Sequence, residues 1–454
     1  MVTNLRALWA QITGSLWFVP GIIVLGAMLL AAGMVELSAA VNQEMLARWP
    51  RVFGAGAESS RSMLSAIAGS MITVAGVTFS ITMVAVTQAS SQYTPRILRN
   101  FMRDRANQVV LGIFVGIFAY CLVVLRTIRG EDDGFFVPSL AVLLGVLLAI
   151  VGIAVLIFFV HHIATTLQAS EIISRITRET VRVAEQIFPE EAREEPPDPE
   201  PGRALAAVAP DQWRPVPAPA TGYIQAVDTK AGLRLLRRCG LVLRVERTVG
   251  EFVVVGLPVA WYAPHPGPVS GRREGNGEER PDIPGSLASL HAVSPYRTID
   301  QDTGFGIRQL VDIALKALSP GINDSTTAVT CLDYLGAILV CLAARRIEPS
   351  CRGEDGVVRI VAPRPTFQSL LREACDEIRQ HAGANVSVLG RALEMLETVG
   401  RATPTAGRRR AVMEQIELVH QAAGTAVPSA HDRDRLDAMA ARARAGVGAA
   451  GSAR

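Results

Sequence analysis

The chain has 454 residues, of which 49% are hydrophobic and only 19% are charged, and its mean hydropathy is +0.28. Soluble globular proteins carry about one quarter charged residues, so this composition argues against a plain cytosolic enzyme. The formal net charge of +3 gives no electrostatic basis for nucleic-acid binding. The 6 cysteines show neither CxxC nor Cys/His ligand spacing, so a disulfide framework or a zinc site is not indicated.

Four apolar stretches are long enough to cross a bilayer, which takes about 20 residues of helix. They cover residues 16–40, 63–88, 109–128 and 137–160, and residues 1–162 are therefore predicted to form a four-helix transmembrane domain. The loop between the second and third stretches carries Arg96, Arg99, Arg103 and Arg105, with a single acid among them. The positive-inside rule places this loop in the cytoplasm. We therefore expect a multi-pass protein of the bacterial inner membrane with both termini cytoplasmic.

Small and hydroxylated residues distinguish the second span from the others. One stripe at helical spacing contains Gly69, Thr73, Gly76, Ser80 and Thr87. Small residues let helices approach closely and hydroxyls bond across the contact, so helix packing is one interpretation. The other is a water-lined path in an oligomer, where hydroxyls replace part of an ion's hydration shell. Packing is the more common role of such residues, and both can hold for different faces.

Five further segments follow the spans. Residues 163–190 have apolar positions at helical spacing, which predicts that the helix continues as an amphipathic stalk. Residues 191–213 are rich in Pro and acids, as extended linkers are. Residues 214–265 alternate like short strands between Gly-containing turns, which predicts a small β-rich barrel or sandwich module. Its G-E-x-V-x-x-G-x-P phrase is similar to turns of lipoyl-type domains, although no Lys occupies a hairpin tip. Residues 266–286 are predicted to be a flexible loop, and 287–445 a cytoplasmic helical domain.

The densest motif is RTIDQDTGFGIRQLVDIALKALSPGIND, from Arg297 to Asp324. Its spacing predicts a helix over 305–318, which Pro320 and the following Gly end. A second helix over 325–344 is apolar enough to be mistaken for a span, but Asp333 in its middle favours a buried cytoplasmic helix.

The acids of this motif allow two interpretations. In the first, a divalent cation takes oxygen ligands from these acids and a neighbouring amide, namely Asp300, Asp302, Asp312, Asn323 and Asp324, although no EF-hand-like spacing is present. Alternatively, Asp302 and Asp324 cap helices and Asp312 pairs with Lys316 four residues later. Capping is the usual role of an Asp before a helix, and Asn323 is the other candidate cap of the second helix. We therefore predict no metal site.

The chain resembles a bacterial predicted-membrane-protein family catalogued as domain of unknown function 2254. The resemblance rests on the order of four spans, on the GYIQAVD and GEFVVVGLPVA strands and on the motif ending in SPGIND. It covers the chain to about Gly400 and implies the architecture, but it brings no established activity, so it adds almost nothing on mechanism.

The remaining helical stripes predict a C-terminal bundle, followed by a disordered tail at 446–454. The fold class is thus a membrane all-α domain of four transmembrane helices plus a cytoplasmic α+β domain. No nucleophile with a base, phosphate-binding Gly loop or metal cluster is visible, so neither an enzyme nor a cofactor is expected.

Two functions remain as hypotheses. The first is a homo-oligomeric channel or transport-like assembly in the lipid bilayer, modulated by its cytoplasmic domain, with the stalk and the Arg96–Arg105 loop as mechanical link. The second is a non-conducting scaffold or sensor that binds a protein or small ligand. The second predicts that other helices of the same protomer cover Thr73, Ser80 and Thr87.

Overall fold

The computed structural model describes residues 17–40, 56–92, 105–129, 136–166, 168–188, 208–266, 282–347, 350–352 and 357–452. The chain divides into two compact units, Met1–Glu171 and Ile172–Arg454, called unit 1 and unit 2 below. Each unit has its own buried core.

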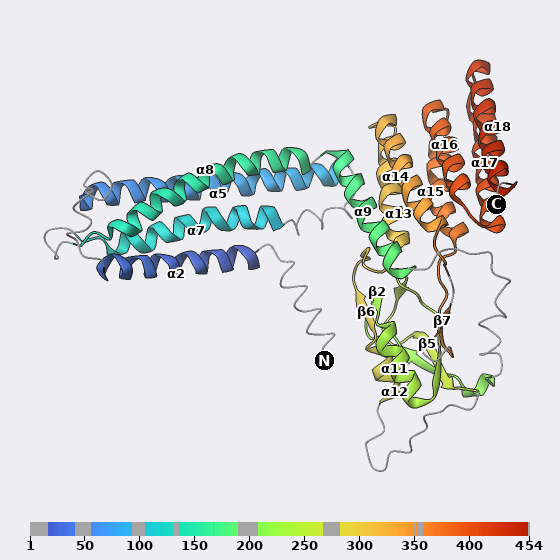
Figure 1. Cartoon of the computed structure of the whole chain (residues 1–454), viewed down its shortest axis with the longest axis horizontal. Helices are drawn as coiled ribbons and strands as arrows, with labels where there is room; N and C mark the ends of the chain where they lie inside the picture. The colour runs from blue at the N-terminus through green and yellow to red at the C-terminus, as the bar shows by residue number, and fades with distance from the viewer. Residues whose placement is uncertain are drawn as a thin grey trace, which may run out of the picture. The chain divides into compact units, whose positions relative to one another are not determined.

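The described part of unit 1 consists of four long helices that lie side by side (Figure 1): α2 (Phe18–Ala40), α5 (Ala57–Gln92), α7 (Arg105–Thr127) and α8 (Ser139–Thr166). Their core centres on α7, where Phe114, Tyr120 and Cys121 are fully buried. The Tyr120 hydroxyl donates to the carbonyl of Ala141 at 2.8 Å, which satisfies a polar group that an apolar bundle would otherwise leave unpaired.

Glycines set the closest approaches between these helices. A Cβ at Gly145 would lie 2.8 Å from Leu64 Cδ2, and one at Gly152 would lie 3.0 Å from Met71 Sδ. Both partners belong to α5, so α8 and α5 pack through glycine notches, as small residues allow in membrane bundles. Unit 1 thus uses one face of α5 to build its core.

In the part of the chain that the structure describes, five helices are long and apolar enough to cross a membrane: the four of unit 1 and α14 (Ser325–Ala343) in unit 2. Within unit 2, α14 packs against α13 (Thr303–Leu318) and α16 (Val386–Ala402). Leu332, Leu335 and Leu339 of α14 are fully buried there. The apolar composition of α14 is therefore explained by a protein core.

Unit 2 contains two small sheets, shown beside α11 (Thr229–Cys239) and α12 (Ile283–Ala288) in Figure 1. The five-stranded sheet has the order β1-β5-β3-β8-β7, and the three-stranded sheet has the order β4-β2-β6. The strand bounds are β1 Arg214–Pro217, β2 Gly222–Val227, β3 Leu241–Val245, β4 Phe252–Val253, β5 Pro258–Pro264, β6 His291–Ser294, β7 Ser350–Arg352 and β8 Val358–Val361. All pairs are antiparallel except β3 with β8, which is parallel. A short 3-10 turn, Pro210–Gln212, precedes β1.

Besides α11 and α12, the described helices of unit 2 are α9 (Ala169–Ile187), α13, α14, α15 (Phe367–His381), α16, α17 (Ala406–Ala426) and α18 (Ala430–Ser452). Side-chain caps mark several helix starts, each accepting a hydrogen bond from a backbone N–H three residues on, as N-caps do. These caps are Asp228, Asp282, Asp302, Asp324, Thr366 and Asn385.

Several predicted boundaries are wrong. The stalk does not continue the fourth span, because α8 ends at Thr166 and α9 begins at Ala169. The β-rich module does not end at residue 265, because β6 pairs with β2 and β8 pairs with β3. The expected loop 266–286 ends early, since α12 starts at Ile283. Residues 189–207, which include most of the predicted linker, lie outside the described residues.

The predicted disordered tail is also wrong, because α18 extends to Ser452. Val447 is only 2% exposed, and its Cγ1 would lie 3.1 Å from a Cβ at Gly400 of α16. Glycines in residues 446–454 lower the intrinsic helix propensity, but glycine also permits close packing, and that contact orders the segment.

Candidate functional site

The outward face of α5 carries the predicted stripe. Gly69, Thr73, Gly76, Ser80 and Thr87 are all exposed in the protomer. At about 100° per residue, this face lies roughly opposite the buried Leu64, Ala68, Met71 and Ala75. The stripe is therefore turned away from the core of unit 1.

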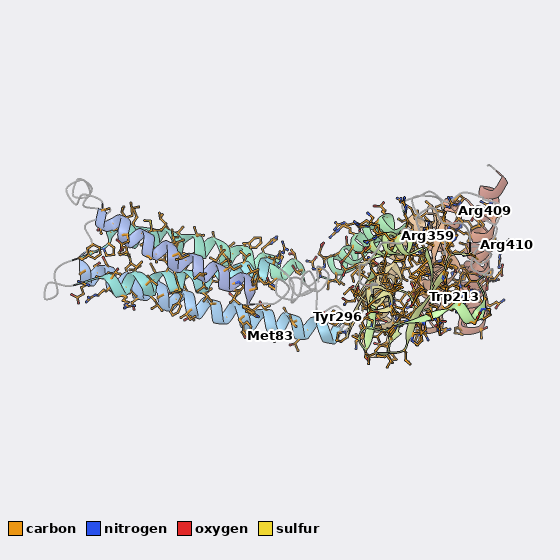
Figure 2. The ribbon with its side chains drawn as sticks, turned by 90° about the horizontal axis from the view of Figure 1, so that it is seen from below. Met83, Trp213, Tyr296, Arg359, Arg409 and Arg410 are labelled. Carbon is orange, nitrogen blue, oxygen red and sulfur yellow. The ribbon has the colours of Figure 1, made fainter. Side chains whose placement is uncertain are left out.

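The outward face has a seven-residue repeat of paired positions four residues apart. Three pairs are small or hydroxylated and a fourth continues the series: Ser62 with Ala66, Gly69 with Thr73, Gly76 with Ser80, and Met83 with Thr87, all exposed. Figure 2 shows Met83 on the side of α5 turned away from the other helices of unit 1. A Cβ added at Gly69 or Gly76 would meet nothing within 4 Å. Small residues four positions apart are the pattern of close helix–helix contacts in membranes.

Two threonine hydroxyls of this face bond to their own helix. Thr73 Oγ1 donates to the carbonyl of Gly69 at 2.8 Å, and Thr87 Oγ1 donates to that of Met83 at 2.8 Å. Such bonds satisfy the donors while leaving the oxygen lone pairs available as acceptors. The scaffold hypothesis predicted that Thr73, Ser80 and Thr87 are covered within the protomer; their exposure contradicts that prediction.

In unit 2, the predicted motif forms a buried polar cluster at the start of α13. Asp302 is 8% exposed and caps the helix by accepting from Phe305 N–H at 2.9 Å. Its second oxygen accepts from Arg297 Nε and Nη2 at 3.0 and 2.8 Å. Gly250, with a φ of +89°, approaches the same carboxylate so closely that a Cβ there would lie 3.1 Å from Asp302 Cγ. The Asp302 carboxylate thus contacts three parts of unit 2: the start of α13, the Gly250 turn of the β-rich module and the Arg297 side chain.

A second ion cluster joins α13 to α15. Arg308 donates to Asp312 Oδ1 at 2.7 Å and to both carboxylate oxygens of Glu377, with Nη2 at 3.1 Å from Oε2. The structure therefore gives Asp312 the guanidinium of Arg308 as partner, where the sequence predicted Lys316. Both pairs have the same spacing along the helix, and a planar guanidinium serves two carboxylates at once better than an ammonium.

Burial changes the pKa values of two carboxyls near the start of α13, those of Asp302 and Glu373. It raises the pKa of Asp302 above its ordinary value, although the ion pair with Arg297 acts in the opposite direction. It likewise raises the pKa of Glu373, which the nearby Asp302 raises further and Arg297 lowers. Glu373 Oε2 would lie 3.2 Å from a Cβ at Gly304. The carboxyls of Asp302 and Glu373 therefore retain protons to higher pH than exposed carboxyls do.

The second glycine of the GFG sequence receives α9. A Cβ at Gly306 would overlap the Thr180 side chain, lying 2.7 Å from its Cγ2 and 2.8 Å from its Cβ. Thr180 is fully buried and donates to the carbonyl of Ile176 at 2.7 Å. Gly306 is thus a notch in α13 that seats α9, the helix that follows α8 in the chain.

The SPGIND segment is a tight connection between two helices. Pro320 follows the C-cap Ser319, and Asn323 adopts a left-handed φ of +50°. Asp324 then caps α14, accepting from Thr327 N–H at 3.0 Å and from the Thr327 hydroxyl at 2.5 Å. This confirms Asp324 as the cap of α14 and assigns Asn323 to the turn, since Asn tolerates the left-handed region better than most residues. Among the described residues, no group of three or more His, Cys, Asp or Glu could hold a metal ion.

Contacts from α17 were not predicted. Arg408 donates to the carbonyls of Leu342, Ala343 and Arg345 at 2.8–3.2 Å. It therefore binds the C-terminal end of α14, where a helix has unpaired carbonyls and partial negative charge.

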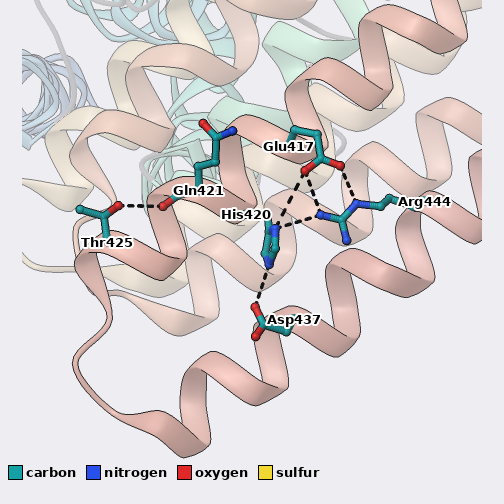
Figure 3. A network of polar contacts seen from close by, with 6 residues as sticks. All are labelled: Glu417, His420, Gln421, Thr425, Asp437 and Arg444. Atoms are coloured by element: carbon teal, nitrogen blue, oxygen red, sulfur yellow. Dashed lines mark hydrogen bonds and ion pairs between the residues drawn. The ribbon is translucent and has the colours of Figure 1, made fainter.

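Farther along α17, His420 lies between Asp437 and Arg444 of α18 (Figure 3). Its Nε2 is 2.8 Å from Asp437 Oδ1, and its Nδ1 accepts from Arg444 Nη2 at 2.9 Å. Arg444 also binds both oxygens of Glu417, at 2.6 and 2.9 Å. These contacts hold α17 to α18. Nothing in the sequence around His420 or Arg444 predicts that these two residues pair with each other or with Asp437 and Glu417.

The predicted arginine loop can be placed only at its end. Arg105 is the first residue of α7, whereas Arg96, Arg99 and Arg103 lie outside the described residues.

The comparisons with known proteins agree with this architecture. The family model of predicted membrane proteins named DUF2254 matches residues 13–398. The chain belongs to the DUF2254 family. The resemblance seen in the sequence is confirmed, and the match extends over both units and ends within α16.

Relatives of this DUF2254 member occur in mycobacteria. Uncharacterized protein Rv1290c of Mycobacterium tuberculosis (strain ATCC 25618 / H37Rv) and Uncharacterized protein Mb1321c of Mycobacterium bovis are each 33% identical to it over 456 residues. Each alignment spans 98% of this chain and 82% of the relative. No solved structure matches the chain.

Proposed function

We propose that this multi-pass membrane protein is a homo-oligomeric channel or transport-like assembly of the bacterial inner membrane. Four spans, α2, α5, α7 and α8, cross the bilayer, and both termini lie in the cytoplasm. Unit 2 is cytoplasmic and has a modulating, non-enzymatic role. The Arg-rich segment between α5 and α7 supports this orientation through the positive-inside rule. The burial of α14 among helices of unit 2 supports four spans in preference to five.

One observation carries the proposal: α5 presents a regular series of small and hydroxylated residues on the side away from its own bundle. In lipid there is no hydrophobic force between helices, so close packing of small side chains is a main source of association. The open Gly69 and Gly76 allow another backbone to approach at this face. Copies that meet there bring Thr73, Ser80 and Thr87 near a common axis, where their outward oxygens can replace ion hydration.

Unit 2 is the proposed modulator because Gly306 of its Arg297–Asp324 motif packs against α9. Only residues 167 and 168 separate α8 from α9, and Gly306 seats α9 against α13. A change in unit 2 that displaces α9 therefore acts on the end of a proposed span. The arginine loop after α5 is the second proposed link, as the sequence suggested.

The test is ion flux from liposomes containing the full chain, across a panel of ions and pH values, with oligomeric state measured in parallel. Thr73→Leu/Ser80→Leu fills the outward face and is expected to lower flux by about tenfold or more. Ile72→Leu/Ile81→Leu is the matched control, because both isoleucines are exposed on the flanks of the same helix. Absence of flux from the wild-type protein under every condition would exclude the channel.

The scaffold or sensor remains the alternative, in a form the structure permits. Because Thr73 and Thr87 already bond to their own helix, the outward face can also be a dry contact between copies. In that case Thr73→Leu/Ser80→Leu changes the oligomeric state, and no ion crosses in either variant.

A further inference from the structure

Unit 2 presents a localised apolar tip. Its described part exposes five large apolar side chains, and four of them lie within six consecutive residues: Phe252, Val254, Val255 and Leu257. Their exposed fractions are 52%, 43%, 58% and 58%. The fifth is Ile322, in the turn between α13 and α14. Single exposed apolar residues are ordinary, whereas a cluster of four marks a contact surface.

The cluster occupies the turn from β4 to β5, which lies against the segment 218–221. Gly256, with a φ of +82°, reverses the chain. The Gly256 amide donates to the carbonyl of Ala218 at 3.1 Å, and the amide of Ala218 donates to Leu257 at 2.8 Å. The exposed Pro219, Ala220 and Thr221 continue the surface. We call residues 218–221 and 252–258 the apolar tip; none of these residues is charged.

The backbone of the tip is largely bonded within the protein. Val255 N–H donates to Thr221 Oγ1 at 3.0 Å, and Leu257 N–H donates to the carbonyl of Val254 at 3.1 Å. Gly256 N–H is bonded as described, and Pro258 has no N–H. The chain from 255 to 258 thus has no donor that needs water. A hydrocarbon phase imposes this requirement on backbone groups, whereas water and polar protein surfaces do not.

We propose that the apolar tip inserts into the surface of the lipid bilayer and anchors unit 2 there. The occupant is lipid for three reasons: the tip is uncharged over eleven positions, its turn amides are internally bonded, and the same polypeptide carries membrane helices. Insertion of a few apolar side chains binds a free protein to lipid weakly and reversibly. Covalent attachment to a membrane domain makes the contact intramolecular and raises its effective concentration.

The test uses the full chain in liposomes, with a nitroxide attached through Val255→Cys. Cys239→Ala, Cys341→Ala and Cys351→Ala remove competing thiols, while the buried Cys121, Cys331 and Cys375 stay. Ala426→Cys provides the matched control, since Ala426 is exposed and uncharged at the end of α17. Collision of each label with oxygen, which concentrates in lipid, is compared with collision with a water-soluble nickel chelate.

At Val255, nickel accessibility is expected to be on the order of tenfold lower than at Ala426, with high oxygen accessibility. Adding Val254→Ser/Leu257→Ser is expected to return the label to water. High nickel accessibility at Val255 would overturn the proposal. Low accessibility to both reagents would overturn it too, because it would show a second copy of the chain or another protein on the tip.

Discussion

Gly306→Ala tests whether α9 is seated on α13. The new methyl carbon would lie 2.7 Å from Thr180 Cγ2, about 1 Å inside the usual 3.5–4.0 Å carbon–carbon contact distance. Overpacking of this kind costs about 1–3 kcal/mol, and replacing Gly in a helix returns about 0.5–1 kcal/mol. Taking the middle of both ranges, about 2 minus about 0.75 kcal/mol, we expect α9 docking to weaken by about 1–2 kcal/mol. This is roughly a 5–30-fold increase in the population in which α9 is undocked.

Hydrogen exchange in the full chain measures this opening locally. Peptides covering 172–188 should exchange about 5–30-fold faster in Gly306→Ala than in the wild type. Gly407→Ala in α17 is the matched control, because its Cβ would meet nothing within 4 Å, and exchange of α9 should not change. Thr180→Ala added to Gly306→Ala should restore part of the protection, since it removes the nearest atoms. Unchanged α9 exchange in Gly306→Ala would refute the docking described for that glycine.

Further predictions concern single caps and contacts of unit 2. Asp324→Ala should lower stability by about 1 kcal/mol through loss of an N-cap. Because the hydrogen bonds from Thr327 lower the pKa of Asp324, its contribution is present in full above pH ~4 and declines as the pH falls toward and through the lowered folded value. Denaturation at pH 7 and pH 3 should therefore show a smaller effect of the mutation at pH 3. Arg408→Leu removes three bonds to the end of α14 and should cost about 2–3 kcal/mol, whereas the exposed Arg410→Leu should stay within about 0.5 kcal/mol. Val447→Ala should destabilise the α16–α18 contact by about 1–2 kcal/mol in thermal unfolding, and an effect near zero would contradict the packing of Val447 on Gly400.

Periodicity and capping chemistry predicted the local elements well. The strand at Gly222–Val227 and the caps Asp302 and Asp324 follow from rules that act within a few residues. The bounds of the four helices of unit 1 likewise lie close to the apolar stretches. Such features depend on neighbours in sequence, which a single chain displays directly.

Contacts between distant segments could not be predicted in the same way. The sequence around Arg308 does not show that its guanidinium also binds the carboxylate of Glu377, 69 residues later. The order of the C-terminal helix depends on Gly400 and Val447 meeting, while the local glycine content predicts the reverse. For the α5 stripe, the sequence identified the residues, but only the packing of unit 1 shows that this face is turned outward.

The parallel pairing of β3 with β8 has a consequence for biosynthesis. Leu243 and Arg244 pair with Ile360 and Val361, more than a hundred positions later in the chain. A nascent polypeptide emerges from the ribosome at about 5–20 residues per second, so the outer side of β3 stays open for several seconds after its own translation. An unpaired edge is a site for aberrant strand addition. A delay in translation between β3 and β8 is therefore expected to give more misassembled protein than an equal delay after residue 361.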